Sequence, residues 1–215
     1  GRPRRLNGHE LSVLRATLPA MTALPSQPQR LLTVADYLAL PEDAEVHHEL
    51  QEGILVMSPR PVPDHQLCLR RTSRQLEDQL PSDLEVLPEV DIDLELVPRD
   101  RPATVRVPDL VVVPHAALER VRQEGGLLRA DEVILAVEII SPGSRRLDTL
   151  VKRDEYADAG IPHYWIVDLG EPGEHITLTA HHLAGEFGYA DAGPVSGTFT
   201  ATEPFPVRVD LDVLV

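Results

Sequence analysis

The chain is poor in cysteine, aromatic residues and lysine, and each shortage excludes something. Cys68 is the only cysteine among 215 residues, which excludes an intramolecular disulfide and a zinc site built on several thiolates. Aromatic residues make up only 4% of the chain. No run approaches the roughly 18 consecutive apolar residues that a membrane-spanning helix needs. We therefore expect a protein without disulfides or membrane helices, and a reducing, cytoplasmic environment fits this expectation.

Positive charge is scarce, and nearly all of it is arginine. The chain has 35 acidic and 20 basic residues, a net charge of −15, which disfavours non-specific binding to nucleic acid. The only lysine is Lys152. An ammonium group is compact and can release a proton, whereas a guanidinium group stays protonated. Lys152 is therefore either a surface lysine that is present by chance or a residue whose role arginine cannot fulfil.

The first thirty residues differ in composition from the rest. They contain five arginines and a single acidic residue, Glu10, and Met21-Thr22-Ala23 reads like a natural start. They lack the apolar core of a secretory signal. We interpret residues 1–30 as an N-terminal extension and expect residues 31–215 to form a single domain, a normal size for one hydrophobic core.

From residue 31 onwards, apolar periodicity and turn residues predict a mixed sheet flanked by helices. The expected class is α/β or α+β, with an N-terminal hairpin and a C-terminal β-meander. The predicted elements, in chain order, are a helix over 33–39, a hairpin over 46–57, a helix that Asp64 caps and that runs to Leu80, strands over 84–96, 105–113 and 133–140, a helix over 148–159, a strand over 164–167 and the meander over 174–215.

One predicted strand carries acidic residues at every second position. In residues 84–96, apolar side chains alternate with Glu89, Asp91, Asp93 and Glu95. Four carboxylates on one face of a strand are able to hold a cation, but alternation of this kind is also typical of an edge strand with one face in water. We expect these four residues to be exposed and without a role in function.

Two carboxylates interrupt apolar strands. Asp109 follows Pro108 within the predicted strand over 105–113, and Glu138 lies within the sequence Leu-Ala-Val-Glu-Ile-Ile. Burying a carboxylate costs several kcal/mol unless a partner compensates for it. If the two lie on adjacent strands, they offer the oxygen ligands that Mg²⁺ requires. The other interpretation is a pair of structural carboxylates bound to arginine or to backbone amides.

Lys152 lies fourteen residues after Glu138, on the helix that follows the strand of Glu138. Side chains in a helix point back toward its N-terminus, which here is the end joined to that strand. Near a metal site, an ammonium group can orient a water molecule or stabilise negative charge on a phosphate. This position favours a functional role for the single lysine.

These residues fall within segments that resemble the Uma-two family of restriction-endonuclease-like proteins. The resemblance covers about residues 33–183 and depends on three segments: Glu49-Leu50-Gln51-Glu52-Gly53 with the strand that follows it, Pro108-Asp109-Leu110-Val111-Val112, and the block from Val137 to Trp165 that contains Glu138-Ile139-Ile140-Ser141-Pro142, Asp148, Lys152, Tyr156 and Ala159-Gly160-Ile161-Pro162. The family belongs to the PD-(D/E)XK nuclease superfamily. The resemblance therefore implies a restriction-endonuclease-like core that presents acidic residues to a magnesium ion.

The resemblance also implies roles for individual residues. Asp109 matches the acidic residue of the Pro-Asp motif, and Glu138 matches the (D/E) position. Ile139 would contribute its backbone carbonyl to the metal. The superfamily motif has a lysine where this chain has Ile140, and in this family Lys152 of the following helix matches the lysine that takes over the role.

Two further residues match the family pattern. Glu49 corresponds to an acidic residue on an early element that is able to complete the metal shell. His65, at the start of the first long helix, corresponds to a histidine of the family. An ordinary histidine at a helix start is the simpler interpretation of His65.

Together, the residues and the resemblance favour an endonuclease that uses Mg²⁺ or Mn²⁺ to hydrolyse DNA phosphodiester bonds. Contact with DNA would come from a local basic patch, and double-strand cleavage with one site per chain would favour a homodimer. The broken motif and the acidity are compatible with an inactive binding or assembly module on the same fold. A metal-dependent hydrolase of a small phosphoester is a third interpretation. The residues predicted for the basic patch are Arg60, Arg70, Arg71, Arg74, Arg145, Arg146 and Arg153.

Overall fold

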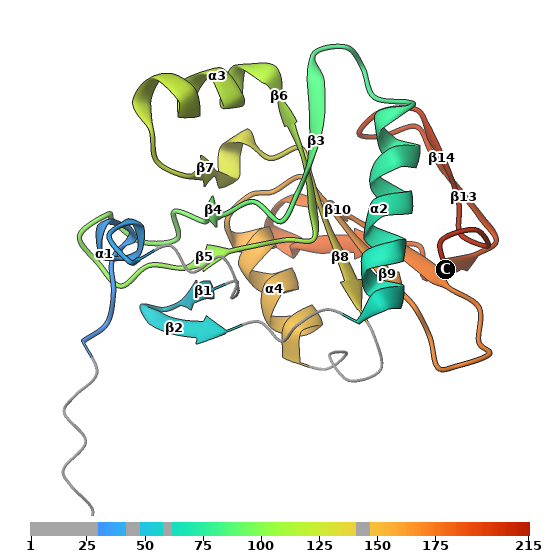
Figure 1. The fold of residues 1–215 in the computed structure, drawn as a ribbon, viewed down its shortest axis with the longest axis horizontal. Coiled ribbons are helices and arrows are strands. Elements are labelled where there is room, and N and C mark those ends of the chain that lie inside the picture. The colour runs from blue at the N-terminus through green and yellow to red at the C-terminus, as the bar shows by residue number, and fades with distance from the viewer. Residues whose placement is uncertain (1–29, 42–47, 58–61, 141–146) are drawn as a thin grey trace, which may run out of the picture.

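The computed structural model describes residues 30–41, 48–57, 62–140 and 147–215. Within these ranges the chain forms two mixed sheets, a separate two-stranded sheet and four α-helices (Figure 1). The predicted class, a mixed sheet flanked by helices, is confirmed. The N-terminal extension predicted over residues 1–30 lies outside the described residues except for Arg30.

The larger sheet has seven strands and forms the centre of the molecule. β8 and β9 are parallel and are connected through α4 (Leu147–Asp158), while the other pairs in this sheet are antiparallel. All six residues of β8 are buried, as its continuous apolar sequence predicts. The strand order is β11 (Tyr189–Asp191), β10 (Thr177–Leu183), β9 (His163–Asp168), β8 (Leu135–Ile140), β6 (Leu110–Pro114) and β3 (Leu84–Pro88), with β12 (Val195–Ser196) paired to β10.

The second sheet has five short strands and contains the predicted N-terminal hairpin. The turn of this hairpin has positive φ at both Glu52 (48°) and Gly53 (82°), as a two-residue type I′ turn requires. Ahead of it, Thr33 caps α1 (Val34–Leu38) in a reciprocal capping box with Asp36. The strand order is β2 (Ile54–Met57), β1 (His48–Gln51), β5 (Val105–Arg106), β4 (Ile92–Asp93) and β7 (Leu128–Arg129).

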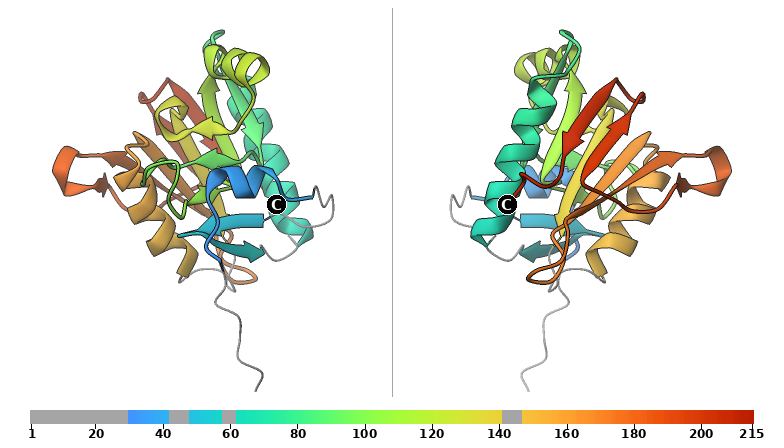
Figure 2. Two further views of the ribbon diagram at one scale, coloured as in Figure 1. Left: turned by 90° about the vertical axis from the view of Figure 1, so that its left-hand side faces the viewer. Right: turned by 90° about the vertical axis from the view of Figure 1, so that its right-hand side faces the viewer.

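α2 (Pro63–Glu77) and α4 cover opposite faces of the seven-stranded sheet (Figure 2). Cys68 and Leu76 of α2 share a core with the odd-numbered residues of β8, whereas Tyr156 of α4 shares a core with Ala136. The hairpin of β13 (Thr198–Ala201) and β14 (Val207–Asp210) packs on α2, where Gln75 exchanges hydrogen bonds with the backbone of Asp210. The even-numbered residues of β8 therefore face α4.

Two predicted strands are each divided in the structure, which corrects the prediction. The segment 84–96 forms β3 and β4 in different sheets, because the backbone takes positive φ at Glu89 (51°), between the two strands. The segment 105–113 is likewise divided into β5 and β6. Pro108 lies at the division, where a residue without an N–H cannot continue the ladder.

The first long helix and the segment after β6 also differ from the prediction. α2 begins at Pro63 and ends at Glu77, and Val62 takes the cap position, so Asp64 lies in the first turn and does not cap the helix. The residues between 113 and 133, for which no element was predicted, form α3 (His115–Glu124), β7 and a short 3₁₀ turn (Ala130–Glu132). Among the described residues, none of the helices has the length and apolar character needed to cross a bilayer.

Replacing Gly53 by alanine should destabilise the fold more than replacing Gly160. The two glycines have similar φ values of 82° and 78°, so alanine costs on the order of 1–2 kcal/mol at either position. A Cβ at Gly53 would in addition lie 2.7 Å from the Cβ of Pro102 and 2.8 Å from that of Leu31, whereas nothing lies within 4 Å at Gly160. Urea unfolding should show a further loss of about 1–3 kcal/mol for Gly53→Ala. Equal losses in the two variants would contradict this close packing.

Candidate functional site

Asp109 directly precedes β6, and Glu138 lies in the adjacent strand β8. β6 and β8 are antiparallel, with Leu110 across from Val137, so continuing the register by one residue places Asp109 across from Glu138. Directly opposed residues of an antiparallel pair project to the same side. Glu138 is 8% exposed, and the side chain of Asp109 is 14% exposed. The charge of Asp109 also acts on Glu138, so the two carboxylates are close at this end of β6 and β8, where His65 of α2 reaches Asp109 and Lys152 of α4 reaches Glu138.

Glu138 is held by two donors from α4. Its Oε1 accepts hydrogen bonds from Nζ of Lys152 at 3.0 Å and from the hydroxyl of Tyr156 at 2.9 Å. Lys152 and Tyr156 are four residues apart and therefore project from the same side of the helix. Burial raises the pKa of Glu138 to about 7. Lys152 opposes that rise, and the Asp109 and Glu49 carboxylates add to it.

Lys152 is buried between two carboxylates and is not a surface cation. Its Nζ lies 2.9 Å from Oε1 of Glu49 and 3.0 Å from Oε1 of Glu138. The residue is 7% exposed. Burial lowers the pKa of the ammonium, but the two carboxylates outweigh burial and hold the pKa above its usual value. The single lysine is therefore a charged group at the centre of a buried network, as its position after Glu138 suggested.

Glu49 connects the smaller sheet to this network. β1 pairs with β5 with Leu50 across from Val105, and this register places Glu49 beside Arg106. Nη1 of Arg106 donates to Oε2 of Glu49 at 2.9 Å, and the backbone N–H of Val107 donates to Oε1 at 3.1 Å. Burial opposes the charge of Glu49, but Lys152 and Arg106 hold the pKa of its carboxyl below the usual range.

Asp109 is held by the backbone of β8 and by a side chain of α2. Its Oδ2 accepts a 2.6 Å hydrogen bond from the backbone N–H of Ile139, and its Oδ1 lies 3.1 Å from Nε2 of His65. His65 projects from the first turn of α2, so the structure brings it into the site, although the sequence favoured an ordinary histidine at a helix start. Burial lowers the pKa of His65, but Asp109 outweighs burial and raises the pKa above its usual value.

Sequence reasoning missed three members of the network: Arg106, Glu155 and Tyr156. Arg106 is 3% exposed and donates to Glu155 through Nε at 2.7 Å and Nη2 at 2.8 Å. A signal for Arg106 was present, because a charge between Val105 and Val107 interrupts an apolar strand just as Glu138 does. Tyr156 lay inside the family-like segment, but no role was assigned to it.

The acidic residues at 89–95 differ from the prediction of a solvent-facing row. Of the four, only Glu95 is exposed, and the others are half-buried. Asp91 accepts a 2.6 Å hydrogen bond from the hydroxyl of Tyr37, and the charge of Glu89 acts on His65. The backbone N–H of Glu89 also donates to the carbonyl of Asp109 at 3.1 Å. Glu89 therefore lies close to the site.

Metal ligands are few within the described part of the chain. No set of three or more His, Cys, Asp or Glu side chains is arranged there to hold a metal ion. Asp109 and Glu138 are two carboxylates, and the ligand predicted for Ile139 is a backbone carbonyl. This donor set consists of oxygen atoms alone, which suits a hard cation such as Mg²⁺ that keeps several of its water molecules.

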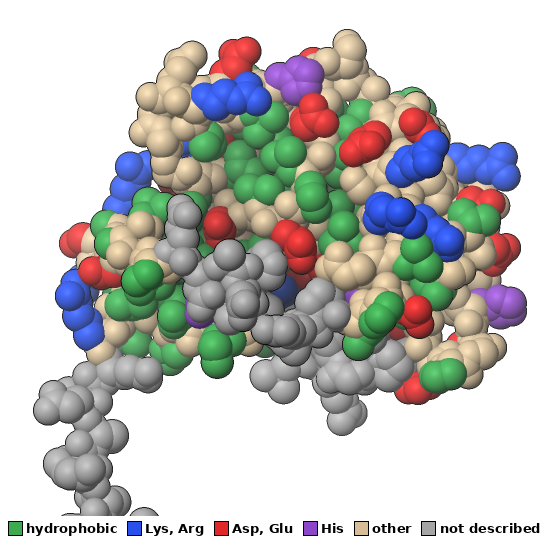
Figure 3. Space-filling view, viewed as in Figure 1, with side chains coloured by type: hydrophobic (Ala, Val, Ile, Leu, Met, Phe, Trp, Pro, Cys, Tyr) green, Lys and Arg blue, Asp and Glu red, His purple; other side chains and the backbone are tan. Residues whose placement is uncertain are grey.

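The predicted basic patch is only partly described. Arg60, Arg145 and Arg146 lie outside the described residues. Arg70 and Arg74 are exposed on α2, over which arginine side chains gather on the face drawn in Figure 3. Arg71 and Arg153 each donate to a backbone carbonyl, of Val213 and Tyr189 respectively. The exposed arginines of α2 are therefore the described members that remain candidates for contact with a phosphate backbone.

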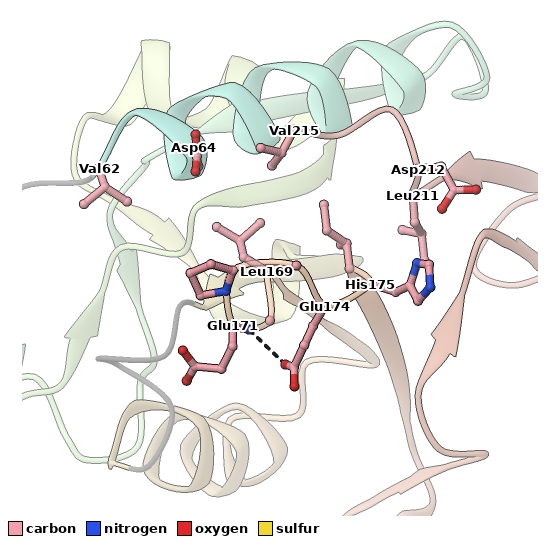
Figure 4. Close-up of a pocket in the computed structure, with 13 residues that line it drawn as sticks. Val62, Asp64, Leu169, Glu171, Glu174, His175, Leu211, Asp212 and Val215 are labelled. Carbon is pink, nitrogen blue, oxygen red and sulfur yellow. Dashed lines mark hydrogen bonds between the residues drawn. The ribbon is translucent and has the colours of Figure 1, made fainter.

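A cavity of about 450 Å³ lies apart from this network (Figure 4). The start of α2, the segment after β9 and the C-terminal residues line it. Its lining contains Asp64, Glu171, Glu174 and Asp212, and Oε2 of Glu174 accepts a 2.9 Å hydrogen bond from the backbone N–H of Glu171. The described residues that line the cavity include no Lys or Arg side chain to attract a phosphate, whereas Lys152 lies 3.0 Å from Glu138, so we place the candidate site at Asp109, Glu138 and Lys152 and not in this cavity.

Comparisons with known proteins identify a family and a similar fold. The family model described as "Uma2: Putative restriction endonuclease" matches residues 34–213. The fold is similar to the crystal structure of a "putative nuclease belonging to DUF820" from Anabaena variabilis ATCC 29413, with a TM-score of 0.62, 18% sequence identity, and coverage of 85% of this chain and 97% of that chain. No curated protein matches the chain.

The pH dependence of stability should report the burial of Glu138. Its pKa in the folded state is raised from 4.5 to about 7, so its contribution is full below pH 4.5 and is lost as the pH rises through about 7. In metal-free buffer, the wild type should lose on the order of 2–3 kcal/mol more unfolding free energy than Glu138→Gln between pH 5 and pH 8. Urea unfolding at both pH values measures this difference. Parallel pH profiles would mean that Glu138 titrates normally.

Proposed function

The chain belongs to the Uma2 family, and from that premise we propose that it is an endonuclease that hydrolyses DNA phosphodiester bonds with the help of a divalent metal ion. The observation that carries the proposal is the pair of neighbouring carboxylates, half-buried Asp109 and buried Glu138, with the ammonium of Lys152 on Glu138. Such groups hold a hard cation and a phosphate close together.

Asp109, Glu138 and the carbonyl of Ile139 would hold Mg²⁺ or Mn²⁺. The oxygen-only donor set fits either ion. The charges of Asp109 and Glu49 raise the pKa of Glu138, because neighbouring carboxylates repel one another. A bound cation would balance this negative charge. When bound, the ion would polarise a phosphoryl oxygen and lower the pKa of a water molecule.

The protein groups around these ligands would orient them. The N–H of Ile139 and the ring of His65 fix the two oxygens of Asp109, and Tyr156 fixes Oε1 of Glu138. A ligand held in this way loses less freedom in the reaction, which is the usual contribution of surrounding hydrogen bonds. His65 and Tyr156 would therefore act through the carboxylates and not on the DNA.

Lys152 would take the role of the lysine that the superfamily motif carries two residues after Glu138. Ile140 stands at that position, but the ammonium of Lys152 reaches Glu138 from α4 at 3.0 Å. Close to the scissile phosphate, it would stabilise the negative charge that develops during attack or hold the attacking water. Glu49 would keep the ammonium charged and in position, since its Oε1 lies 2.9 Å from Nζ.

DNA would approach from the side of α2, where Arg70 and Arg74 are exposed. The net charge of −15 disfavours tight, sequence-blind binding, so contact would depend on such local groups. Because one chain carries one set of these residues, double-strand cleavage would require two copies, which favours a homodimer. A cytoplasmic location fits the single, buried Cys68.

The wild type should nick supercoiled plasmid only when Mg²⁺ or Mn²⁺ is present, and Glu138→Gln should abolish nicking because an amide is a weaker ligand than a carboxylate. Asp158→Asn, an exposed carboxylate at the end of α4, is the matched control and should remain active. Gel electrophoresis of plasmid with and without EDTA measures both. Hydrolysis of a chromogenic phosphodiester with intact plasmid would favour the small-phosphoester hydrolase, and inactivity on both substrates would favour the binding module.

Lys152→Arg should lower the cleavage rate by about 10²-fold or more. Arginine stays protonated and is too large for the position between Glu49 and Glu138, where a single Nζ serves both carboxylates. Binding of Mg²⁺, measured by titration calorimetry, should persist in Lys152→Arg because Asp109 and Glu138 are unchanged. Full activity of this variant would show that any cation suffices.

A further inference from the structure

Arg106 connects two carboxylates that lie on different elements. Its guanidinium binds Glu155 of α4 through Nε and Nη2, at 2.7 and 2.8 Å, and binds Glu49 of β1 through Nη1 at 2.9 Å. Side-chain exposure is 3% for Arg106, 6% for Glu49 and 15% for Glu155. A planar guanidinium with three nitrogens engaged fixes both carboxylates relative to one another.

The orientation of Glu49 determines where Lys152 is held. Arg106 occupies Oε2 of Glu49, so Oε1 is the oxygen that turns toward Nζ of Lys152 at 2.9 Å. Glu155 lies three residues after Lys152 on α4, so the same helix supplies the ammonium and anchors the guanidinium. We propose that Arg106 and Glu155 are positioning residues, which fix Glu49 so that it holds the ammonium of Lys152 against Glu138. This inference rests on the proposed nuclease function.

Stability alone does not account for the buried charges. Taking an ion pair out of water costs several kcal/mol per ion, and apolar residues of similar volume are often as stable or more stable in its place. Arg106 reaches its two carboxylates through three separate nitrogens, whereas Lys152, the only lysine, reaches two carboxylates through a single Nζ. This division matches the geometry that each cation supplies.

The test compares two ways of disrupting the Arg106–Glu155 pair. Arg106→Lys keeps the charge but loses the fork, while the double variant Arg106→Met with Glu155→Leu removes one charge of each sign and keeps the volume. The matched control is Arg120→Lys, since Arg120 forms a similar ion pair with Glu132 and also donates to the carbonyl of Leu127. Should the double variant not fold, Glu155→Gln takes its place.

Two readouts are measured on each folded variant. The first is the ¹⁵Nζ resonance of the metal-free protein labelled with ¹⁵N-lysine, which belongs to Lys152 because the chain has no other lysine. The second is the rate of plasmid nicking with Mg²⁺, separated into kcat and KM for DNA.

We expect both disruptions to shift the Nζ resonance and to lower kcat about 10- to 100-fold, with KM within about threefold, because the ligands and the DNA-contacting groups remain. Arg120→Lys should leave both readouts unchanged. A wild-type Nζ resonance or a wild-type kcat in the folded double variant would overturn the positioning role. If the wild type does not nick DNA, the proposed function fails, and the Nζ resonance still decides whether Arg106 and Glu155 position Lys152.

Discussion

Two buried carboxylates from different sheets, Glu49 and Glu138, share the ammonium of Lys152. Without that ammonium, Glu138 would lose its main charge partner, and burial already raises its pKa to about 7. The shared ammonium joins β1, β8 and α4 at one point. The position of α4 over the sheet and the charge state of the candidate site therefore depend on the same contact.

The chain brings these groups together by passing from one sheet to the other. Arg106 belongs to β5 of the five-stranded sheet, and Asp109 directly precedes β6 of the seven-stranded sheet. The crossing occurs at Pro108, which has no N–H for a ladder. Only two residues along the chain thus separate the cation that holds Glu49 from the carboxylate that lies across from Glu138. A continuous strand would have placed Arg106 and Asp109 on opposite faces of one sheet.

The sequence predicted members of the candidate site where a charged residue was rare or interrupted an apolar pattern. Asp109 and Glu138 interrupt apolar strands, and Lys152 is the only residue of its type. Arg106 gave the same signal as Glu138, but it was one basic residue among many arginines. Glu155 gave none, since an acidic residue on a helix ordinarily faces water. The division of 84–96 could not be predicted either, because its cause is a positive φ at Glu89, where the sequence has no glycine to indicate one.

The central claim is that Asp109 and Glu138 hold a divalent metal ion beside Lys152. A crystal structure of the protein with Mn²⁺ tests this claim most directly, because anomalous scattering locates the ion independently of the surrounding atoms. The account predicts a peak between the two carboxylates, in contact with the carbonyl of Ile139, with Nζ of Lys152 still on Glu49. A peak confined to the acidic cavity lined by Glu171 and Glu174, or no peak at Asp109 and Glu138, would contradict it.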